Sequence, residues 1–307
     1  TDQGAVWIVS VKPDGTVSAQ QKVSALEGGF GGALDPEDYF GVAAGALGDL
    51  NGDGVVDLAV AAIGDDDGGS SQGAVWILLL NANGTVASAQ KISATAGGFG
   101  GDLDPDEDFG ISIASLGDLD GDGLLDLAVG AGLDDDGALN QGALWILALN
   151  TDGTVVAERK ISETSGDFGG VLDSGDRFGT AAACLGDLDG DGVLDLAVGA
   201  INDDDGGTDQ GAVWILFLDE DTNPPVLTCP PAVSVIDRKF NGPGELVFFS
   251  VTASDDCDPA PLVVCMPPSG SFFPRGTTMV TCTATDAAGN QSVCMFPVFV
   301  MPTAQRL

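Results

Sequence analysis

Short apolar runs separated by turn-forming residues recur along the first two thirds of the chain. In one stretch, GVAAGAL (41–47) consists of small residues, DLAVAAI (57–63) is apolar throughout and GAVWILLL (73–80) adds a bulky tryptophan. TVASAQKISA (85–94) alternates and carries Lys91, which is typical of an outer, half-exposed strand. Gly, Asp and Asn clusters separate the runs, and no segment has the apolar stripe of a helix. The pattern predicts four short strands per unit.

This unit repeats every 69 residues without insertion or deletion. The motif QGA[VL]W occurs four times and ends at Trp7, Trp76, Trp145 and Trp214. A Phe-Gly pair marks the start of three units, at Phe40, Phe109 and Phe178. Such a period indicates supersecondary units that bury their faces against neighbours, and four strands per unit suggest propeller blades. We expect these aromatic side chains in the core between blades, with a sugar-stacking platform as the alternative.

The sequence predicts three units plus a partial blade. The segments Gly4–Val11 and Thr16–Ala25 match the third and fourth strands of a unit, and the unit that opens at Phe178 stops at Leu218 before a fourth strand. We therefore expect that this chain does not complete a ring in the usual way. The open blade faces and strand edges would invite pairing.

The character of the sequence changes at DEDTNPP (219–225), where acidic residues and two prolines predict a short stiff linker. Five of the six cysteines lie between Cys229 and Cys294, which indicates disulfides and an oxidising compartment. We expect a repeat domain at 1–218, a second domain at 226–301 and a tail at 302–307. The remaining cysteine, Cys184, is expected to be a buried free thiol.

Charge restricts the function. The net charge of −37 excludes nucleic acid as a partner and would repel anionic membranes, but it suits divalent cations. The chain has no histidine, which removes the usual general base, the Ser-His and Cys-His pairs and most zinc sites. No apolar run is long enough to insert into a membrane. We expect no enzyme, although a carboxylate-pair glycosidase remains formally possible.

Three acidic loops of the form D-x-[DN]-x-D-G-x-x-D carry the strongest chemical signal. Positions 1, 3, 5 and 9 offer side-chain oxygens, position 7 offers a backbone carbonyl, and the glycine at position 6 allows the sharp turn that brings them together. This donor set predicts three structural Ca²⁺ sites, against the alternative of Asx-turns with solvated carboxylates. The predicted ligands are Asp49, Asn51, Asp53, Val55 and Asp57; Asp118, Asp120, Asp122, Leu124 and Asp126; and Asp187, Asp189, Asp191, Val193 and Asp195.

A second acidic set is weaker. It comprises Asp65–Asp67, Asp134–Asp136 and Asp203–Asp205, together with the acidic residues that precede two of the Phe-Gly pairs, Asp35, Glu37 and Asp38 before Phe40 and Asp104 to Asp108 before Phe109. We interpret these as solvated turns on the face opposite the calcium loops, with extra cation sites or a cation-bridged ligand contact as the alternative.

Two family resemblances rest on these residues. DYFGVAAGALGDLNGDGVVDLAVAA and its two counterparts resemble the FG-GAP repeat of integrin alpha propellers over residues 1–218, which implies blades and the same calcium role. PPVLTCPPAVSV and SGSFFPRGTTMVTCTATDAAGNQSVCMFPVFV resemble the hyalin repeat (HYR) domain, which implies an immunoglobulin-like β-sandwich. Within it we favour Cys265–Cys282, on two runs that could pair side by side, and Cys229–Cys294, tying the first strand to the last. Cys257 would remain free or seek another chain.

The fold class is therefore all-β, and the expected function is that of a secreted, calcium-stabilised structural or adhesive protein of a microbial surface or matrix. Head-to-tail assembly into a filament is expected, with an N-terminal strand or the Met301–Leu307 tail completing a neighbour. The alternative is an extracellular module that binds a glycan or protein and belongs to a larger integrin-like propeller protein, whose missing blades would lie upstream. Asn83-Gly-Thr and Asn290-Gln-Ser are compatible with surface glycans.

Overall fold

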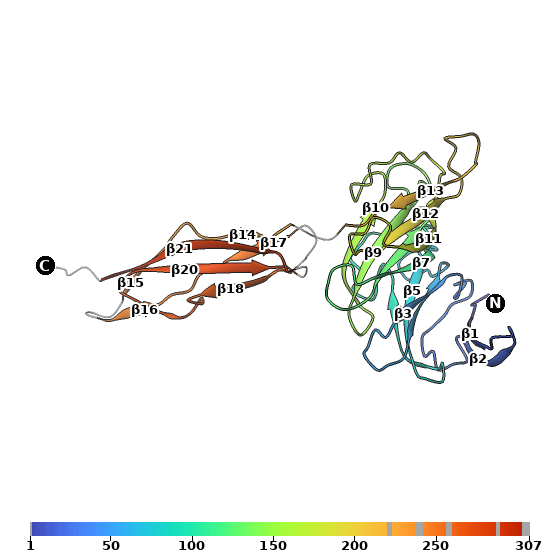
Figure 1. Cartoon of the computed structure of the whole chain (residues 1–307), viewed down its shortest axis with the longest axis horizontal. Coiled ribbons are helices and arrows are strands. Elements are labelled where there is room, and N and C mark those ends of the chain that lie inside the picture. The colour runs from blue at the N-terminus through green and yellow to red at the C-terminus, as the bar shows by residue number, and fades with distance from the viewer. Residues whose placement is uncertain (1, 220–222, 238–241, 256–259, 287–288, 303–307) are drawn as a thin grey trace. The chain divides into compact units, whose positions relative to one another are not determined.

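The computed structural model describes residues 2–219, 223–237, 242–255, 260–286 and 289–302, and all of its regular elements are β-strands (Figure 1). The described residues contain no helix long and apolar enough to cross a membrane. Thr1–Leu119 and Gly123–Asp219 form one compact unit, and a second unit follows Asp219. The Cys257 thiol and residues 303–307 of the expected tail lie outside the described residues.

The first unit consists of four antiparallel sheets that follow one another along the chain. The first is a hairpin, β1 (Val6–Val11) and β2 (Val17–Val23). Two four-stranded sheets follow, β3 (Ala44–Gly48), β4 (Asp57–Ala62), β5 (Ala74–Leu80) and β6 (Val86–Ile92), then β7 (Phe109–Gly117), β8 (Asp126–Ala131), β9 (Ala143–Leu149) and β10 (Val155–Ile161). The last sheet has three strands, β11 (Phe178–Gly186), β12 (Asp195–Ala200) and β13 (Ala212–Leu216).

The predicted strands are present, and most bounds differ by one or two residues. The largest difference is in the first complete blade, where β3 begins at Ala44 instead of Gly41. Gly41 has φ of +98°, and its counterparts Gly110 and Gly179, which lie within β7 and β11, have φ of +101° and +88°. The Gly41 amide donates a hydrogen bond to the Ala61 carbonyl at 2.8 Å. The Phe-Gly pair therefore has the same left-handed turn in all three blades, and only the start of regular pairing differs.

Backbone bridges join each blade to the next. Gly73, which precedes β5, bridges Phe109 at the start of β7, and the pairs Gly4–Phe40 and Gly142–Phe178 repeat this contact. The Phe109 amide donates to the Gln72 carbonyl at 3.0 Å, while the Gln72 side-chain amide donates to the Leu103 carbonyl. The Gln-Gly dipeptide before each tryptophan strand is thus the joint between consecutive blades.

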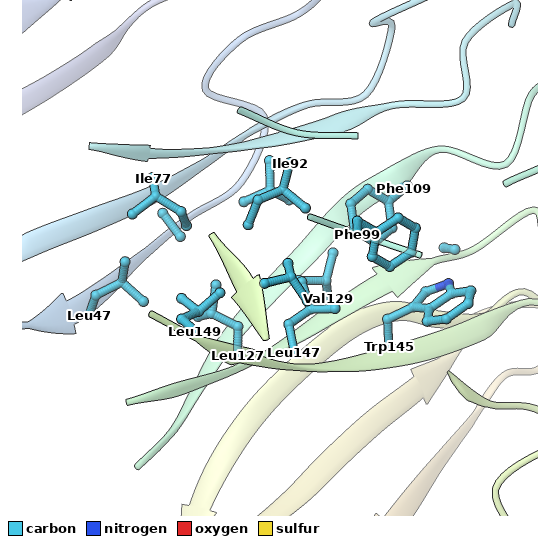
Figure 2. Close-up of a cluster of buried hydrophobic side chains, with 14 of the residues drawn as sticks. Leu47, Ile77, Ile92, Phe99, Phe109, Leu127, Val129, Trp145, Leu147 and Leu149 are labelled. Atoms are coloured by element: carbon cyan, nitrogen blue, oxygen red, sulfur yellow. The ribbon is translucent and has the colours of Figure 1, made fainter. Parts of the chain in front are cut away.

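The blade interfaces form the hydrophobic core. Figure 2 shows the cluster between the first and second four-stranded sheets, where Ile77 and Leu47 lie near Leu127 and Leu149. The Phe99 ring packs between those of Phe109 and Trp145, tilted to the first and edge-to-face with the second, with ring centroids 5.2 and 5.0 Å away. The same triad recurs as Phe30–Phe40–Trp76 and Phe168–Phe178–Trp214. These tryptophans are therefore core residues, as expected, and their partners at Phe30, Phe99 and Phe168 were missed although they share the 69-residue period.

The two outer sheets of this unit expose apolar side chains that their repeats bury. Trp7 is 51% exposed whereas Trp76 is 6% exposed, so the expectation of a core residue is wrong for Trp7. At the other end, Val213 and Ile215 of β13 are 67% and 42% exposed, whereas Val75 and Ile77 are fully buried. The difference follows from packing, because β5 has sheets on both faces.

Cys184 is a free thiol, but it is exposed, and the expectation of a buried side chain is wrong. It lies opposite Leu196 on β11, which is an edge strand of the three-stranded sheet. β7 packs against β11, but among the described residues no later blade packs against β11 in turn, so Cys184 stays in contact with solvent.

The second unit has short strands around a core of its own. Its main sheet has the order β15 (Val233–Asp237), β21 (Gln291–Pro302), β20 (Gly276–Thr285) and β18 (Leu262–Met266), with β15 parallel to β21. Two smaller pairs join β14 (Val226–Thr228) to β17 (Thr252–Ser254) and β16 (Gly244–Leu246) to β19 (Phe272–Pro274). The core contains Val247, Phe273, Phe296 and Val298, consistent with an immunoglobulin-like sandwich.

Two disulfides tie this unit together, Cys265–Cys282 and Cys229–Cys294. Both pairs are those that the sequence favoured. Cys265 faces Cys282 across β18 and β20, and Cys282 faces Cys294 across β20 and β21. Strand register therefore brings the four sulfurs to one place in the core.

Candidate metal loops and lysine clamps

The last aspartate of each acidic loop is buried and anchors the loop. Asp57, Asp126 and Asp195 begin the second strand of their blades and are at most 2% exposed. The Asp57 carboxylate accepts the amides of Leu50 at 3.0 Å and of Leu80 at 2.8 Å. Asp195 accepts those of Leu188 at 2.7 Å and Leu218 at 3.1 Å. Burial raises the pKa of Asp57, because desolvation disfavours the ionised carboxylate. A positive charge close by would favour the ionised form again.

The glycine at position 6 turns each loop as expected. Gly54, Gly123 and Gly192 have φ of +86°, +91° and +105°, which only glycine adopts without strain. The carboxylate at position 1 then accepts a hydrogen bond from the backbone amide of that glycine. Gly54 donates to Asp49 at 2.7 Å, and Gly123 donates to Asp118 at 3.0 Å. The side chains of Val55 and Leu124, at position 7, pack on the core. The loop is thus a compact turn with its carboxylates gathered on one side.

The loops gather their carboxylates to different extents. Oxygens of Asp118, Asp120 and Asp122 lie within 4.8 Å of one another, as do those of Asp187, Asp189 and Asp195. A further set joins Asp189 and Asp191 to Asp219, which the sequence analysis did not single out. The fully described first loop contains no such trio, because Asn51 places an amide at position 3, and its Nδ2 donates to Asp53 at 3.3 Å.

Crowding of carboxylates is chemically costly without a cation. Desolvation and the nearby charges of Asp191 and Asp195 raise the pKa of Asp189. Several carboxylate and carbonyl oxygens around one point are the donor set that Ca²⁺ prefers. The residues of the second and third loops therefore fit a calcium ion.

The second acidic set forms lysine clamps in the first two of its three groups. The first aspartate of every group is buried, so the interpretation as a solvated turn is wrong for Asp65, Asp134 and Asp203. Asp65 is 4% exposed and Asp134 is 1% exposed. Lys91 from β6 bridges Asp65 and Asp67, and Lys160 from β10 bridges Asp134 and, at 2.6 Å, Asp136. Each ammonium also lies over the tryptophan of the neighbouring strand, 5.6 Å from the Trp76 ring and 5.3 Å from the Trp145 ring. Although desolvation acts in the opposite direction, hydrogen bonds and charge from the two aspartates raise the pKa of both lysines.

A third carboxyl group is buried beside each clamp. Asp38, Glu107 and Asp176 recur with the 69-residue period and are at most 4% exposed. Desolvation, together with the charge of the clamp aspartate, raises the pKa of Asp38 to about 6 and that of Glu107 to about 7. Desolvation and the Asp203 charge also raise the pKa of Asp176. These buried acids could have been identified from the sequence, because they recur with the same 69-residue period as the lysines.

The two glycosylation sequons differ in exposure. Asn83 is exposed in the turn before β6, where it accepts hydrogen bonds from the amide and hydroxyl of Thr85. Asn290 is half-buried, and its backbone amide donates a hydrogen bond to the Asp286 carboxylate at 2.7 Å.

Successive four-stranded blades with an Asp-rich loop in each, followed by a disulfide-bonded sandwich, define a propeller-type repeat protein with an immunoglobulin-like domain. Family models match this chain in the same places, the FG-GAP repeat at residues 40–78, 109–147 and 179–216 and the HYR domain at residues 220–300. The chain therefore carries FG-GAP repeats followed by a HYR domain.

Known proteins similar to this chain include integrin alpha subunits and a hyalin. Integrin alpha-3 of Cricetulus griseus is 33% identical over 201 residues, 65% of this chain and 17% of that protein. Integrin alpha-PS2 of Drosophila melanogaster is 34% identical over 188 residues, 60% of this chain and 12% of that protein. Hyalin of Strongylocentrotus purpuratus is 37% identical over 91 residues, 29% of this chain and 8% of that protein. The chain spans less than a fifth of each of these relatives.

Proposed function

We propose that this protein is an extracellular, calcium-stabilised adhesive or structural protein that assembles head to tail. Its similarity to integrin alpha and hyalin proteins supports an adhesive or ligand-binding role, and its two disulfides suit an oxidising compartment. The observation that carries the calcium part is the gathering of three carboxylates within 4.8 Å in the second and third loops.

Each loop holds one Ca²⁺ through the ligands named from the sequence, with Asp219 as a further ligand in the third blade. The ion stabilises the blade, because the carboxylate at position 9 accepts hydrogen bonds both from the loop and from the neighbouring strand, as Asp57 does from Leu50 and from Leu80 at the end of β5. No catalytic role is proposed for these carboxylates.

Thermal unfolding with Ca²⁺ and with a chelator tests this role. An ion that binds only the folded state adds about 2.7 kcal/mol per site at a hundredfold excess over Kd. The melting temperature of the repeat unit should therefore rise with calcium concentration. An unchanged melting curve after chelation would show that the loops are Asx-turns without a structural ion.

Self-assembly is supported by the apolar side chains that the outer sheets expose, Trp7 and Val9 on β1 and Val213 and Ile215 on β13. These are two different surfaces, so a contact between them is heterologous and propagates unless its rotation closes. Deletion of residues 1–25 should abolish growth of the particle in light scattering. Undiminished growth would exclude β1 and β2 as the connector.

A ligand-binding module is the second candidate. Asp66, Asp135 and Asp204 are exposed at the same position of three consecutive blades, as a surface for a cation-bridged glycan or protein would require. Saturable binding by a monomeric particle would favour this function over assembly.

A further inference from the structure

The third blade lacks the strand that completes the other two. β6 pairs with β5 and β10 pairs with β9, whereas the sheet of β11, β12 and β13 ends at β13 among the described residues. No strand formed by the described residues after Asp219 pairs with β13. The outer edge of β13 therefore presents unpaired backbone groups.

The third blade also has a clamp without a lysine. Asp203, Asp205 and Trp214 repeat Asp65, Asp67 and Trp76 at a spacing of 138 residues. Asp203 is 6% exposed and accepts the Asp205 amide at 3.3 Å, the distance found between Asp65 and Asp67. Within the described residues no salt bridge reaches Asp203 or Asp205. The buried carboxyl of Asp176 adds to the negative charge at this point.

The matching lysine is on β2. Lys22 lies opposite Trp7 in the β1–β2 register, as Lys91 lies opposite Trp76 and Lys160 opposite Trp145. Its side chain is 31% exposed, against 13% for Lys91 and 11% for Lys160, and its salt bridge runs to exposed Glu27 at 3.1 Å. β2 thus has the sequence and register of a fourth strand without the aspartate clamp.

β1 and β13 are interchangeable in sequence. TDQGAVWI at 1–8 is identical to TDQGAVWI at 208–215. Val6 and Ile8 pack against the first four-stranded blade, next to Val60, Trp76 and Leu78. Their counterparts Val213 and Ile215 are exposed. The β13 segment therefore carries the side chains that this interface accepts, together with the aspartates that Lys22 lacks.

We propose that β13 of one copy takes the place of β1 in a second copy, so that the second copy's β2 completes the third blade of the first. Lys22 then enters the clamp of Asp203, Asp205 and Trp214, and Val213 and Ile215 are buried where Val6 and Ile8 were. Residues 208–215 are identical to residues 1–8, so Val213–Ile215 can make the contacts that Val6–Ile8 make with β2 and the first four-stranded blade. The exchange replaces the pairing of Val9–Val11 with that of a different sequence and adds the ion pairs of Lys22. Three blades per copy then form a continuous array. This inference rests on the proposed self-assembly and names its interface.

Charge reversal in the full chain tests the interface. Lys22→Glu and Asp205→Lys should each weaken association at least about tenfold in light scattering, because each places like charges together. Asp205 is exposed in the chain, so its substitution leaves the fold intact. Lys12→Glu, at an exposed lysine in the β1–β2 turn, is the matched control and should assemble normally. Mixing the two variants should restore at least dimers, because Lys22 of the Asp205→Lys chain can still pair with Asp205 of the Lys22→Glu chain.

Crosslinking tests the register. In a Cys184→Ser background, Gln21→Cys in one chain should form a disulfide with Ile215→Cys in another, because Gln21 lies opposite Ile8 and Ile215 repeats Ile8. Gln20→Cys points to the opposite face of β2 and should not crosslink with Ile215→Cys. Assembly that is indifferent to Lys22→Glu, or that yields no Gln21–Ile215 crosslink, would overturn the strand exchange while leaving self-assembly intact. A wild-type chain that stays monomeric at every concentration would overturn both.

Discussion

Gly73 lies so close to Phe109 that no side chain fits between them. A Cβ built on Gly73 would be 2.2 Å from the Phe109 carbonyl oxygen, and the φ of Gly73 is +87°. The same contact recurs at Gly4 with Phe40 and at Gly142 with Phe178. The glycine of each Gln-Gly dipeptide is therefore required twice, by its backbone conformation and by the approach of the next blade.

Gly73→Ala should consequently destabilise the repeat unit by more than about 3 kcal/mol, because it combines a clash with left-handed strain. Gly15→Ala is a matched control, since Gly15 has φ of +82° with nothing within 4 Å of its Cβ position. We expect it to cost only about 1–2 kcal/mol. Urea unfolding of the two variants measures the difference, and equal costs would show that blade contact plays no part.

Lys160→Met should destabilise the second blade by about 3–5 kcal/mol, because it leaves the buried carboxylate of Asp134 without its cation. Lys22→Met in the monomer should cost at most about 1 kcal/mol, since Lys22 pairs with an exposed glutamate. Addition of Asp134→Asn to Lys160→Met should recover part of the loss. A double variant no more stable than Lys160→Met alone would contradict the charge explanation.

Glu107 makes stability depend on pH. Its pKa is about 7 in the folded protein against an ordinary value of 4.5, so the folded state binds the proton more tightly than the unfolded chain does. This contribution is fully present below about pH 4.5 and is lost as pH rises through about 7. Glu107→Gln should flatten the melting temperature over this range. The control is Glu37→Gln, at an exposed residue beside Asp38, the counterpart of Glu107 in the preceding repeat. It should leave the pH dependence of the melting temperature unchanged.

Asp122→Ala should lower the melting temperature in calcium and much less in chelator, because Asp122 is one of the carboxylates gathered in the second loop. Asp102→Ala removes an exposed carboxylate outside the loops and serves as the control. Differential scanning calorimetry with and without Ca²⁺ gives both comparisons. An equal loss under the two conditions would assign Asp122 a role in the turn alone.

Reduction should loosen the HYR domain before the blades, since both disulfides lie in the second unit. Replacing Cys265 and Cys282 by serine should cost this unit about 2–5 kcal/mol. Hydrogen exchange followed separately in peptides from the two units checks this. Faster exchange in the blades alone would contradict it.

The repeat, the strand order within a blade and the acidic turns could be predicted from the amino-acid sequence. Each of these follows from local physical chemistry: alternation sets a strand, a glycine permits a left-handed turn, and a 69-residue period places equivalent residues in equivalent positions. The acidic loops could be recognised because their donors lie within nine consecutive residues.

Which of the equivalent residues are buried could not be predicted from the sequence, because it depends on how the blades pack. Trp7 and Trp76 lie in the same phrase, yet one is 51% exposed and the other 6%, because a sheet packs over only one of them. Lys91 was interpreted as half-exposed from its strand, and Asp65 as part of a solvated turn, but strand pairing brings them together from positions 26 residues apart. Burial and ion pairing depend on which neighbour covers a side chain, and a repeated sequence specifies the same local structure whether or not that neighbour is present.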